Sequence, residues 1–398
     1  MANRQEITRS QAVTYHRADK SGKSRILDQV CWATEYNRDY ARRVLRQMYT
    51  PRVVRPRVVR PPKYGPDVVA ALEKCWQVLG APAGKRLAPG LAELVPALRR
   101  FGELDIDDTV AALLVTMSAA TIDRRLAPVK ARYGPRGRSH TKPGTMLKSR
   151  IPLRTWSEHD ENTPGYLEID LVGHEGGNNS GTHCFTLTVT DIAVGWTVNR
   201  TVMGKTDDVV LAALIHIAAG LPYPVLGIDC DNGSEFINHL FEQHCIAHEL
   251  KFTRSRAGKS NDGAHVEQKN WTTVRQLVGY LRYDTGAELL LLNKIWEIQS
   301  PLANHFYPQQ KLISKVRDGA RVSKKYDTAT TPYARLQAHP EVKALPKRRL
   351  RKTHDTINPA ALQRQVQALC EQLFTIAHAK AQPTPKPRVE PAARGHSG

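Results

Sequence analysis

The middle of the chain carries the clearest pattern of hydrophobic and polar positions. Leu167, Ile169 and Leu171 alternate with Glu168 and Asp170, which is typical of a strand with one buried face. The same reasoning predicts the elements that follow in order, namely strands at 185–189 and 197–202, a helix at 207–219, a strand at 225–229, a helix at 235–246 and a strand at 249–253. This order indicates a mixed α/β sheet of five strands covered by helices.

Two helical regions precede this sheet. In KSRILDQVCWATEYNRDYARRVLRQ, 23–47, the apolar spacing predicts two short helices around a turn, the outline of a helix-turn-helix DNA-binding domain over 1–50. The second region, 66–127, ends in helices with Asp107 or Asp108 and Ser118 as N-caps. It predicts a second, helix-turn-helix-like domain, so that the front half is all-α.

Two segments between these regions are rich in basic residues and proline. Residues 51–65 contain PRVVR twice in tandem, and proline prevents a continuous helix there. An extended arm along DNA and a stiff, soluble linker both agree with this composition. Residues 128–154 hold eight Lys or Arg and no Asp or Glu. They predict a cationic linker over 128–160.

The charge of the chain is distributed unevenly. The 398 residues carry a formal net charge of +20, which favours a polyanionic partner such as nucleic acid. Ribosomal or membrane-surface binding agrees with the charge as well. Residues 165–280, however, have 13 acidic and 8 basic residues, so the sheet region is acidic within a basic protein. A metal-dependent active site flanked by nucleic-acid-binding segments accounts for both signs.

Other classes of protein find no support in the composition. No run of 18 apolar residues exists and the N-terminus MANRQEITRSQ has no apolar signal core, so we expect a cytoplasmic protein without a membrane span. Six cysteines lie far apart without a Cys-x-x-Cys pair. They predict reduced, mostly buried thiols rather than a zinc site or a disulfide framework.

Three acidic residues lie in or next to three different predicted secondary-structure elements. Asp170 is in the first strand, Asp231 follows the fourth strand in GIDCDNGSEF, and Glu267 is on the helix predicted after the fifth. Asp-Asn-Gly alone is ordinary turn chemistry. Hard divalent cations, however, need several oxygen ligands, and strand ends and a helix that converge on one side of a sheet can supply them. The interval between Asp231 and Glu267 is 35 residues.

The segments IDLV at 169–172, DNGSEF at 231–236 and HVEQKNW at 265–271 resemble the catalytic core of DDE transposases and retroviral-type integrases, which have an RNase H-like fold. The D,D-35-E interval belongs to that signature. The flanking sequences CWATEYNRDYARRVL, SKVRDGARVSKKYD and TPYARL look like those of bacterial insertion-sequence transposases. The zinc-binding HHCC domain of retroviral integrases is missing before residue 140, where the predicted helix-turn-helix units stand instead.

The resemblance implies an RNase H-like catalytic core at 161–300, with Asp170, Asp231 and Glu267 as catalytic ligands of two Mg²⁺ or Mn²⁺ ions. It implies a transposase that binds the ends of a mobile element, exposes 3′-hydroxyl ends and joins them to target DNA. A nuclease of the same fold that only hydrolyses, or a catalytically inactive DNA-binding repressor, are the alternatives. We expect the region 301–380 to be a basic DNA-binding or assembly region, and residues 381–398 to form a disordered tail.

The implied partners are double-stranded DNA, as terminal inverted repeats and as target, and further copies of the chain in a homodimer or larger multimer. We expect no nucleotide cofactor and no membrane, and a bacterial protein associated with the nucleoid. The basic residues expected to contact DNA, for which solvated surface charge is the competing interpretation, are Arg38, Arg42, Arg43, Arg46, Arg52, Arg55, Arg57, Arg60, Arg124, Arg125, Arg254, Arg256, Lys259, Lys269 and Arg275.

Four further residues near the expected site have weaker signals. Glu168 and Asp229 are candidates for accessory charges beside the three carboxylates, or for simple solvated acids. His174 and His265 are candidates for orienting ligands or water, although a lone histidine is more often structural. Asp191, Asp207 and Asp208 are better suited to turns and helix caps.

Overall fold

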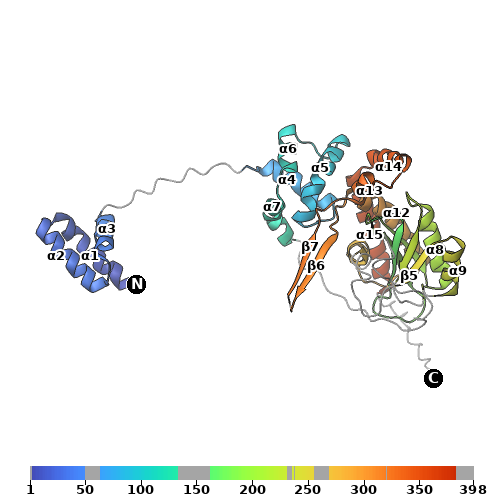
Figure 1. Cartoon of the computed structure of the whole chain (residues 1–398), viewed down its shortest axis with the longest axis horizontal. Helices are drawn as coiled ribbons and strands as arrows, with labels where there is room; N and C mark the ends of the chain where they lie inside the picture. The colour runs from blue at the N-terminus through green and yellow to red at the C-terminus, as the bar shows by residue number, and fades with distance from the viewer. Residues whose placement is uncertain are drawn as a thin grey trace, which may run out of the picture. The chain divides into compact units, whose positions relative to one another are not determined.

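The computed structural model describes residues 2–49, 63–132, 162–230, 235–236, 238–254, 269–319 and 321–381 of the chain (Figure 1). These residues form two compact units, Met1–Lys63 and Tyr64–Gly398. Of the predicted segments, the Pro/Arg arm at 51–65, the linker at 128–160 and the tail at 381–398 lie wholly or mostly outside the described residues.

The first unit contains the helices α1 (Ala2–Arg17), α2 (Lys20–Thr34) and α3 (Arg38–Tyr49). Asp19 caps α2 by accepting a hydrogen bond from Gly22 N, and Glu35 ends it in the left-handed conformation at φ 58°. The predicted helical N-terminal region is confirmed, and its assignment as a helix-turn-helix stays a prediction. The sequence did not reveal α1, because the buried positions of this helix are Thr8, Ala12 and Tyr15 rather than a row of aliphatic side chains.

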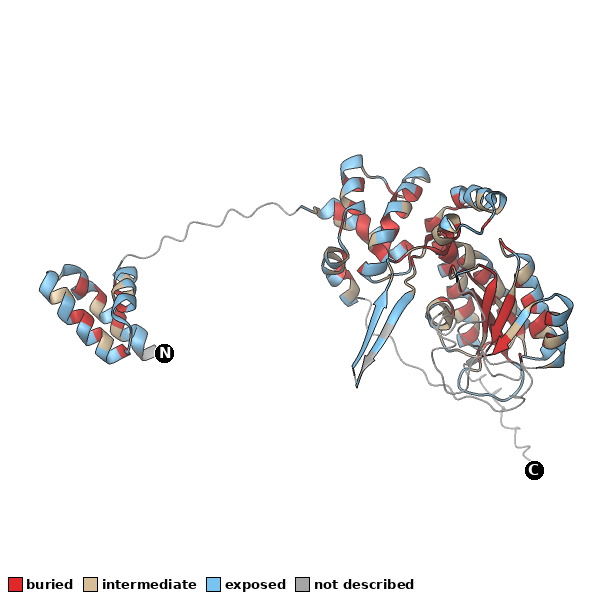
Figure 2. Ribbon diagram, viewed as in Figure 1, coloured by how far each residue is buried: buried red, intermediate tan, exposed pale blue. Residues whose placement is uncertain are grey.

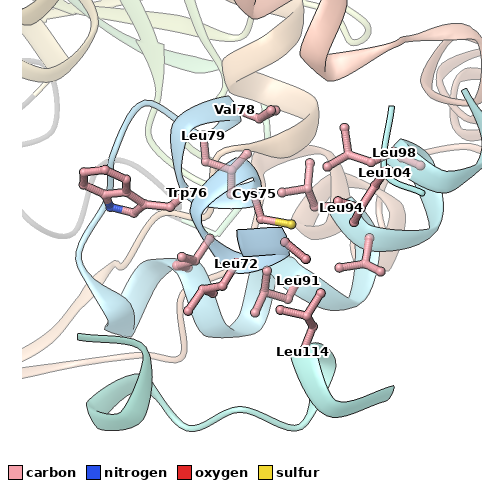
Figure 3. Close-up of a cluster of buried hydrophobic side chains, with 14 of the residues drawn as sticks. Leu72, Cys75, Trp76, Val78, Leu79, Leu91, Leu94, Leu98, Leu104 and Leu114 are labelled. Carbon is pink, nitrogen blue, oxygen red and sulfur yellow. The ribbon is translucent and has the colours of Figure 1, made fainter. Parts of the chain in front are cut away.

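The second unit begins with four helices that share one apolar core (Figure 3), α4 (Pro66–Val78), α5 (Gly84–Arg100), α6 (Asp108–Val115) and α7 (Ala119–Arg132). Asp107 caps α6, as expected from the sequence, by accepting a hydrogen bond of 2.7 Å from Val110 N. Leu302 and Phe306, from a later helix, are part of the same core. The four helices are therefore packed onto the rest of this unit.

The predicted mixed sheet of five strands is confirmed. Its strands are β1 (Tyr166–Gly173), β2 (Cys184–Asp191), β3 (Thr197–Met203), β4 (Gly227–Cys230) and β5 (Lys251–Arg254), in the order β3-β2-β1-β4-β5. The pairs β1–β2 and β2–β3 are antiparallel, whereas β4 runs parallel to β1 and β5 parallel to β4. Helix α8 (Asp207–Ala219) has the predicted bounds, and α9 (His239–Ala247) follows β4.

The side chains of the sheet are sorted by face, because successive residues of a strand point to opposite sides. One face is apolar and packs on α8 and α9, with Leu167, Ile169 and Ile228 in this core. The opposite face carries polar side chains that are nevertheless buried, among them Glu168 and Asp229. Figure 2 shows the central strands of this sheet mostly in the colour of buried residues.

After the last strand of the sheet, the chain forms a layer of helices on the polar face. A π-helical turn, η1 (Asn270–Arg275), leads into α11 (Gln276–Val278) and then the long helix α12 (Gly286–Phe306), which begins with a capping box between Thr285 and Glu288. The last helix, α15 (Pro359–Ala381), packs along α12 through Val366, Cys370 and Leu373, beside Trp296.

The region expected to be a basic C-terminal segment has regular structure. It contains a β-hairpin, β6 (Leu312–Asp318) with β7 (Arg321–Tyr326), and the helices α13 (Pro332–Ala338) and α14 (Ala344–Thr356). The hairpin was not predicted. Among the helices of the described ranges, none is both long and apolar enough to cross a membrane.

Candidate functional site

Asp170 lies on the polar face of β1 and is half-buried. Its Oδ1 accepts a hydrogen bond of 2.8 Å from the backbone N–H of Leu171, and its Oδ2 accepts one of 2.5 Å from Nδ2 of Asn270. The second bond connects residues that are 100 positions apart in the chain. It brings the start of η1 directly to the carboxylate of Asp170.

The pairing of β1 with β4 shows which part of the chain lies beside Asp170. Ile169 pairs with Cys230, the last residue of β4. In the sequence, each of these two residues is followed by an aspartate, Asp170 and Asp231. Asp231 itself lies outside the described residues, as does Glu267, which precedes Asn270 by three positions.

Two other carboxylates accompany Asp170 on the polar face. Glu168 and Asp229 are directly opposite in the β1–β4 register, and both are buried. Oδ1 of Asp229 accepts a hydrogen bond of 2.5 Å from the hydroxyl of Thr253 on β5. Buried acids need such donors because burial removes their contact with water. This part of the sheet therefore concentrates acidic oxygen atoms beside Asp170.

His174 has a structural place within the same face. Its Nε2 is 2.7 Å from the hydroxyl of Thr186, which is 2.8 Å from the hydroxyl of Thr201, and Nε1 of Trp296 donates to Thr201 over 2.7 Å. Burial, with the nearby charges of Arg275 and His183, lowers the pKa of His174 to about 3. The imidazole is thus neutral near pH 7 and links β1, β2, β3 and α12. His265, the other candidate, lies outside the described residues.

Three basic residues expected to contact DNA have partners within the protein. Arg275 donates to the carbonyl oxygen of Gly173 over 2.7 Å and lies over the ring of Tyr280. The ammonium group of Lys269 donates to Oε1 of Gln309, and burial lowers the pKa of Lys269 to about 7. Arg254 is 6% exposed at the end of β5. As placed, these side chains stabilise the fold around the site.

The other basic candidates fall into two groups. On α3, Arg38 is paired with Asp28, Arg42 with Asp39, and Arg43 lies over the ring of Tyr40, while Arg46 is exposed. Arg124, exposed on α7, donates to Ala120 O and Thr121 Oγ1 at 3.3 Å, and Arg125 on the same helix is half-buried. The candidates that lie outside the described residues are Arg52, Arg55, Arg57, Arg60, Arg256 and Lys259.

The described residues alone do not complete a metal site. Within these ranges, no group of three or more His, Cys, Asp or Glu side chains is placed to hold a metal ion. Two of the three expected ligands are outside the ranges. Asp191, in contrast, has the predicted turn role, since its carboxylate accepts hydrogen bonds from Gly165 N and Val194 N at 2.7 and 2.8 Å.

Sequence reasoning missed Asn270 and the threonines of the polar face as site residues. Asn270 follows Glu267 by three positions in the segment HVEQKNW, but nothing in the sequence showed that its amide reaches Asp170. The signal for the threonines was present in the alternation of CFTLTVTD, where Thr186, Thr188 and Thr190 occupy every second position. All three are buried.

Comparison with known proteins gave one curated relative over most of the chain. No family model matches the sequence. The "Uncharacterized protein y4rM" of Sinorhizobium fredii (strain NBRC 101917 / NGR234) is 38% identical over 344 residues, which are 84% of this chain and 95% of the relative.

Solved structures were also matched over part of the chain, among them two catalytic core domains. The catalytic core domain of BIV integrase has a TM-score of 0.29 at 16% identity and covers 43% of this chain and 91% of its own. The HTLV-2 integrase catalytic core domain in complex with magnesium has a TM-score of 0.27 at 17% identity. This match covers 38% of this chain and 91% of the HTLV-2 chain.

Proposed function

The chain belongs to the family of the uncharacterized protein y4rM, and we propose that it is a DNA transposase or integrase of the DDE type with an RNase H-like catalytic core. In this proposal the protein binds the ends of a mobile element, cleaves them to expose 3′-hydroxyl groups and joins these to target DNA. Asp170, Asp231 and Glu267 are the proposed catalytic residues.

The observation that carries the proposal is the hydrogen bond from Asn270 to Asp170. Glu267 and Asn270 are three positions apart, the spacing at which two helical residues share a face. A helix that delivers Asn270 to Asp170 is suited to deliver Glu267 to the same place. The π-helical conformation of η1 supports this interpretation, because single π-turns are rare and are frequent at functional sites.

The strand register supports the position of the second aspartate. Ile169 and Cys230 are paired neighbours, and Asp170 and Asp231 are the residues that follow them. Each aspartate thus directly follows one member of a residue pair that joins two adjacent parallel strands. Together, the register and the Asn270 contact link the three chain segments that carry the D,D-35-E signature.

The donor chemistry of this region suits a hard divalent cation. The candidate ligands are all carboxylates, and Mg²⁺ and Mn²⁺ prefer oxygen donors. Cys230, the nearest thiol in sequence, belongs to the opposite, apolar face of the sheet. We propose that Asp170, Asp231 and Glu267 hold two such ions, which supply activation of the attacking hydroxyl and charge neutralisation at the scissile phosphate.

The chain's own residues prepare the site. Asn270 and the N–H of Leu171 fix both oxygen atoms of Asp170, so the carboxylate is oriented before a ligand arrives. Thr253 holds Asp229, which limits that acid to a supporting role. The acidic sheet region repels DNA phosphates unless cations are present, whereas the basic remainder of the chain attracts the duplex.

The test uses end-labelled DNA that carries the ends of the element encoding the protein, with Mg²⁺. We expect nicked and joined products from the wild type and neither from Asp170→Asn, Asp231→Asn or Glu267→Gln, while binding to the ends persists. Asp207→Asn, an acid in the first turn of α8, is the matched control and should keep both activities. Strand transfer retained in any of the three amide variants would contradict the assignment.

Two outcomes of the same assay separate the alternatives. Nicked products without joined products would indicate a nuclease of the same fold. Specific binding to the ends without any nicking in Mg²⁺ or Mn²⁺ would indicate a repressor.

A further inference from the structure

The described side chains of the β6–β7 hairpin are exposed on both of its faces. Every residue of β7 is exposed, and large apolar side chains of β6 are exposed as well, with Ile313 at 60% and Val316 at 61%. Figure 2 shows the hairpin extending from its unit in the colour of exposed residues. An isolated two-stranded hairpin is marginally stable in water, so a ribbon of this kind calls for a partner.

The base of the hairpin, in contrast, is firmly attached. Asp327 accepts a hydrogen bond of 2.6 Å from Lys311 N and forms an ion pair of 2.7 Å with Arg335 of α13. Arg335 also donates to the carbonyl oxygen of Gln309, which pairs with Thr330 on the other side of the base. The hairpin therefore projects from a fixed origin.

The charge of the ribbon identifies the kind of partner. Residues 311–326 contain six Lys or Arg and a single Asp. On β7, Arg321, Lys324 and Lys325 are all exposed. Contact between two such hairpins would bring like charges together, whereas a polyanion neutralises them.

The dimensions agree with duplex DNA. Strands of seven and six residues span about 20 Å, and two paired strands lie about 4.8 Å apart. The major groove of B-DNA, about 12 Å wide, admits a two-stranded ribbon. We propose that the β6–β7 hairpin inserts into the major groove of bound DNA, with Arg321, Lys324 and Lys325 contacting the flanking phosphates. This inference rests on the proposed function for the identity of its partner as DNA.

The first experiment measures DNA binding in EDTA, where no cleavage takes place, across a range of salt concentrations. We expect the triple variant Arg321→Ala, Lys324→Ala, Lys325→Ala to raise Kd and to reduce the slope of log K against log salt by about 2 to 3, because each lost phosphate contact removes about 0.9. Lys74→Ala, Lys85→Ala, Lys294→Ala removes the same charge from exposed positions on α4, α5 and α12. An equal effect of both triple variants, or a wild-type slope in the first, would overturn the inference.

The second experiment locates the hairpin on DNA. Ser323→Cys in a Cys31→Ser background offers one exposed thiol, since the remaining five cysteines are buried. An iron-EDTA group attached there should cleave both strands at positions that face one major groove. Cleavage scattered along the duplex, or efficient cross-linking of two copies through residue 323 without DNA, would assign the hairpin to another role.

The two proposals fail in different ways. A protein whose hairpin variant loses binding but whose wild type never cleaves DNA retains this inference and loses the proposed activity. A protein that cleaves and joins DNA, and in which the hairpin variant binds as the wild type does, retains the activity and loses the inference.

Discussion

The two faces of the five-stranded sheet are built by the same strands and are both buried, yet their chemistry is opposite. On the apolar face, Leu167, Ile169 and Ile228 pack against α8 and α9. On the polar face, Asp170 and Asp229 lie among threonines and meet their partners through hydrogen bonds. The apolar face supplies free energy of folding, and the polar face holds carboxylates in fixed positions through hydrogen bonds.

Helix α12 also covers an open edge of the sheet. Asn304 of α12 accepts a hydrogen bond from Thr197 N and donates to Thr197 O, and Asn293 makes the same pair of bonds with Thr201. β3 is an edge strand of the sheet, and unpaired backbone groups at an edge invite association with other chains. The two amides take the place of a neighbouring strand.

Neighbouring residues on opposite faces test this division most strongly. Ile169→Ala removes a fully buried side chain and should lower the free energy of unfolding by about 2 to 5 kcal/mol. Asp170→Asn, one position later, should change stability far less and abolish catalysis. Urea unfolding, together with the DNA-joining assay, measures both. A catalytically active Asp170→Asn, or an Ile169→Ala of wild-type stability, would contradict the division.

The second largest effect is expected at the edge strand β3, which the asparagines of α12 cover. Asn293→Leu or Asn304→Leu leaves a buried N–H and C=O of β3 without their partners, and each should cost about 1 to 3 kcal/mol. Size-exclusion chromatography should additionally show association that the wild type lacks. Asn178→Leu, in the exposed loop after β1, is a control for the change of residue type. Wild-type stability in both α12 variants would show that the amides do not protect the edge.

The last expected effect concerns pH and develops gradually, one pH unit at a time. The pKa of His174 is lowered in the fold, so folding favours the neutral imidazole, and its stability contribution is present above the unfolded pKa near 6.5 and lost as pH falls toward 3. We expect an acid-dependent loss of up to about 1.4 kcal/mol per pH unit in this window. His174→Gln should reduce the difference in stability between pH 7 and pH 5.

The control for this prediction is His216→Gln, at an exposed position of α8. Urea titrations of the three proteins at both pH values provide the comparison. An unchanged pH dependence in His174→Gln would show that the buried imidazole is not responsible for the acid loss.

The sequence predicted the sheet well because apolar and polar residues alternate along its strands, and each kind forms one face. CFTLTVTD places threonine at every second position, and such patterns located the strands to within one or two residues of their observed bounds. The β6–β7 hairpin could not be recognised this way, because neither of its faces is buried and its apolar residues do not recur at every second position. Periodicity reports burial, and an exposed ribbon leaves no such signal.

The candidate site shows a similar limit. Asp170 was identified from a short motif, but the contact from Asn270 depends on how a helix 100 residues later crosses β1. Lys269 and Arg275 were expected to contact DNA because they are basic, and charge alone does not tell whether a side chain points to solvent or to Gln309 and Gly173. Tertiary packing decides both.

The proposed activity requires that Asp170, Asp231 and Glu267 together bind divalent cations. The most direct measurement is the shift in thermal unfolding with increasing Mg²⁺, because a ligand that binds only the folded state stabilises it by about 2.7 kcal/mol at a hundred times its Kd. We expect a concentration-dependent rise in Tm for the wild type and for Asp207→Asn, and its loss in Asp170→Asn, Asp231→Asn and Glu267→Gln. A rise of wild-type size in any of these three variants would contradict it.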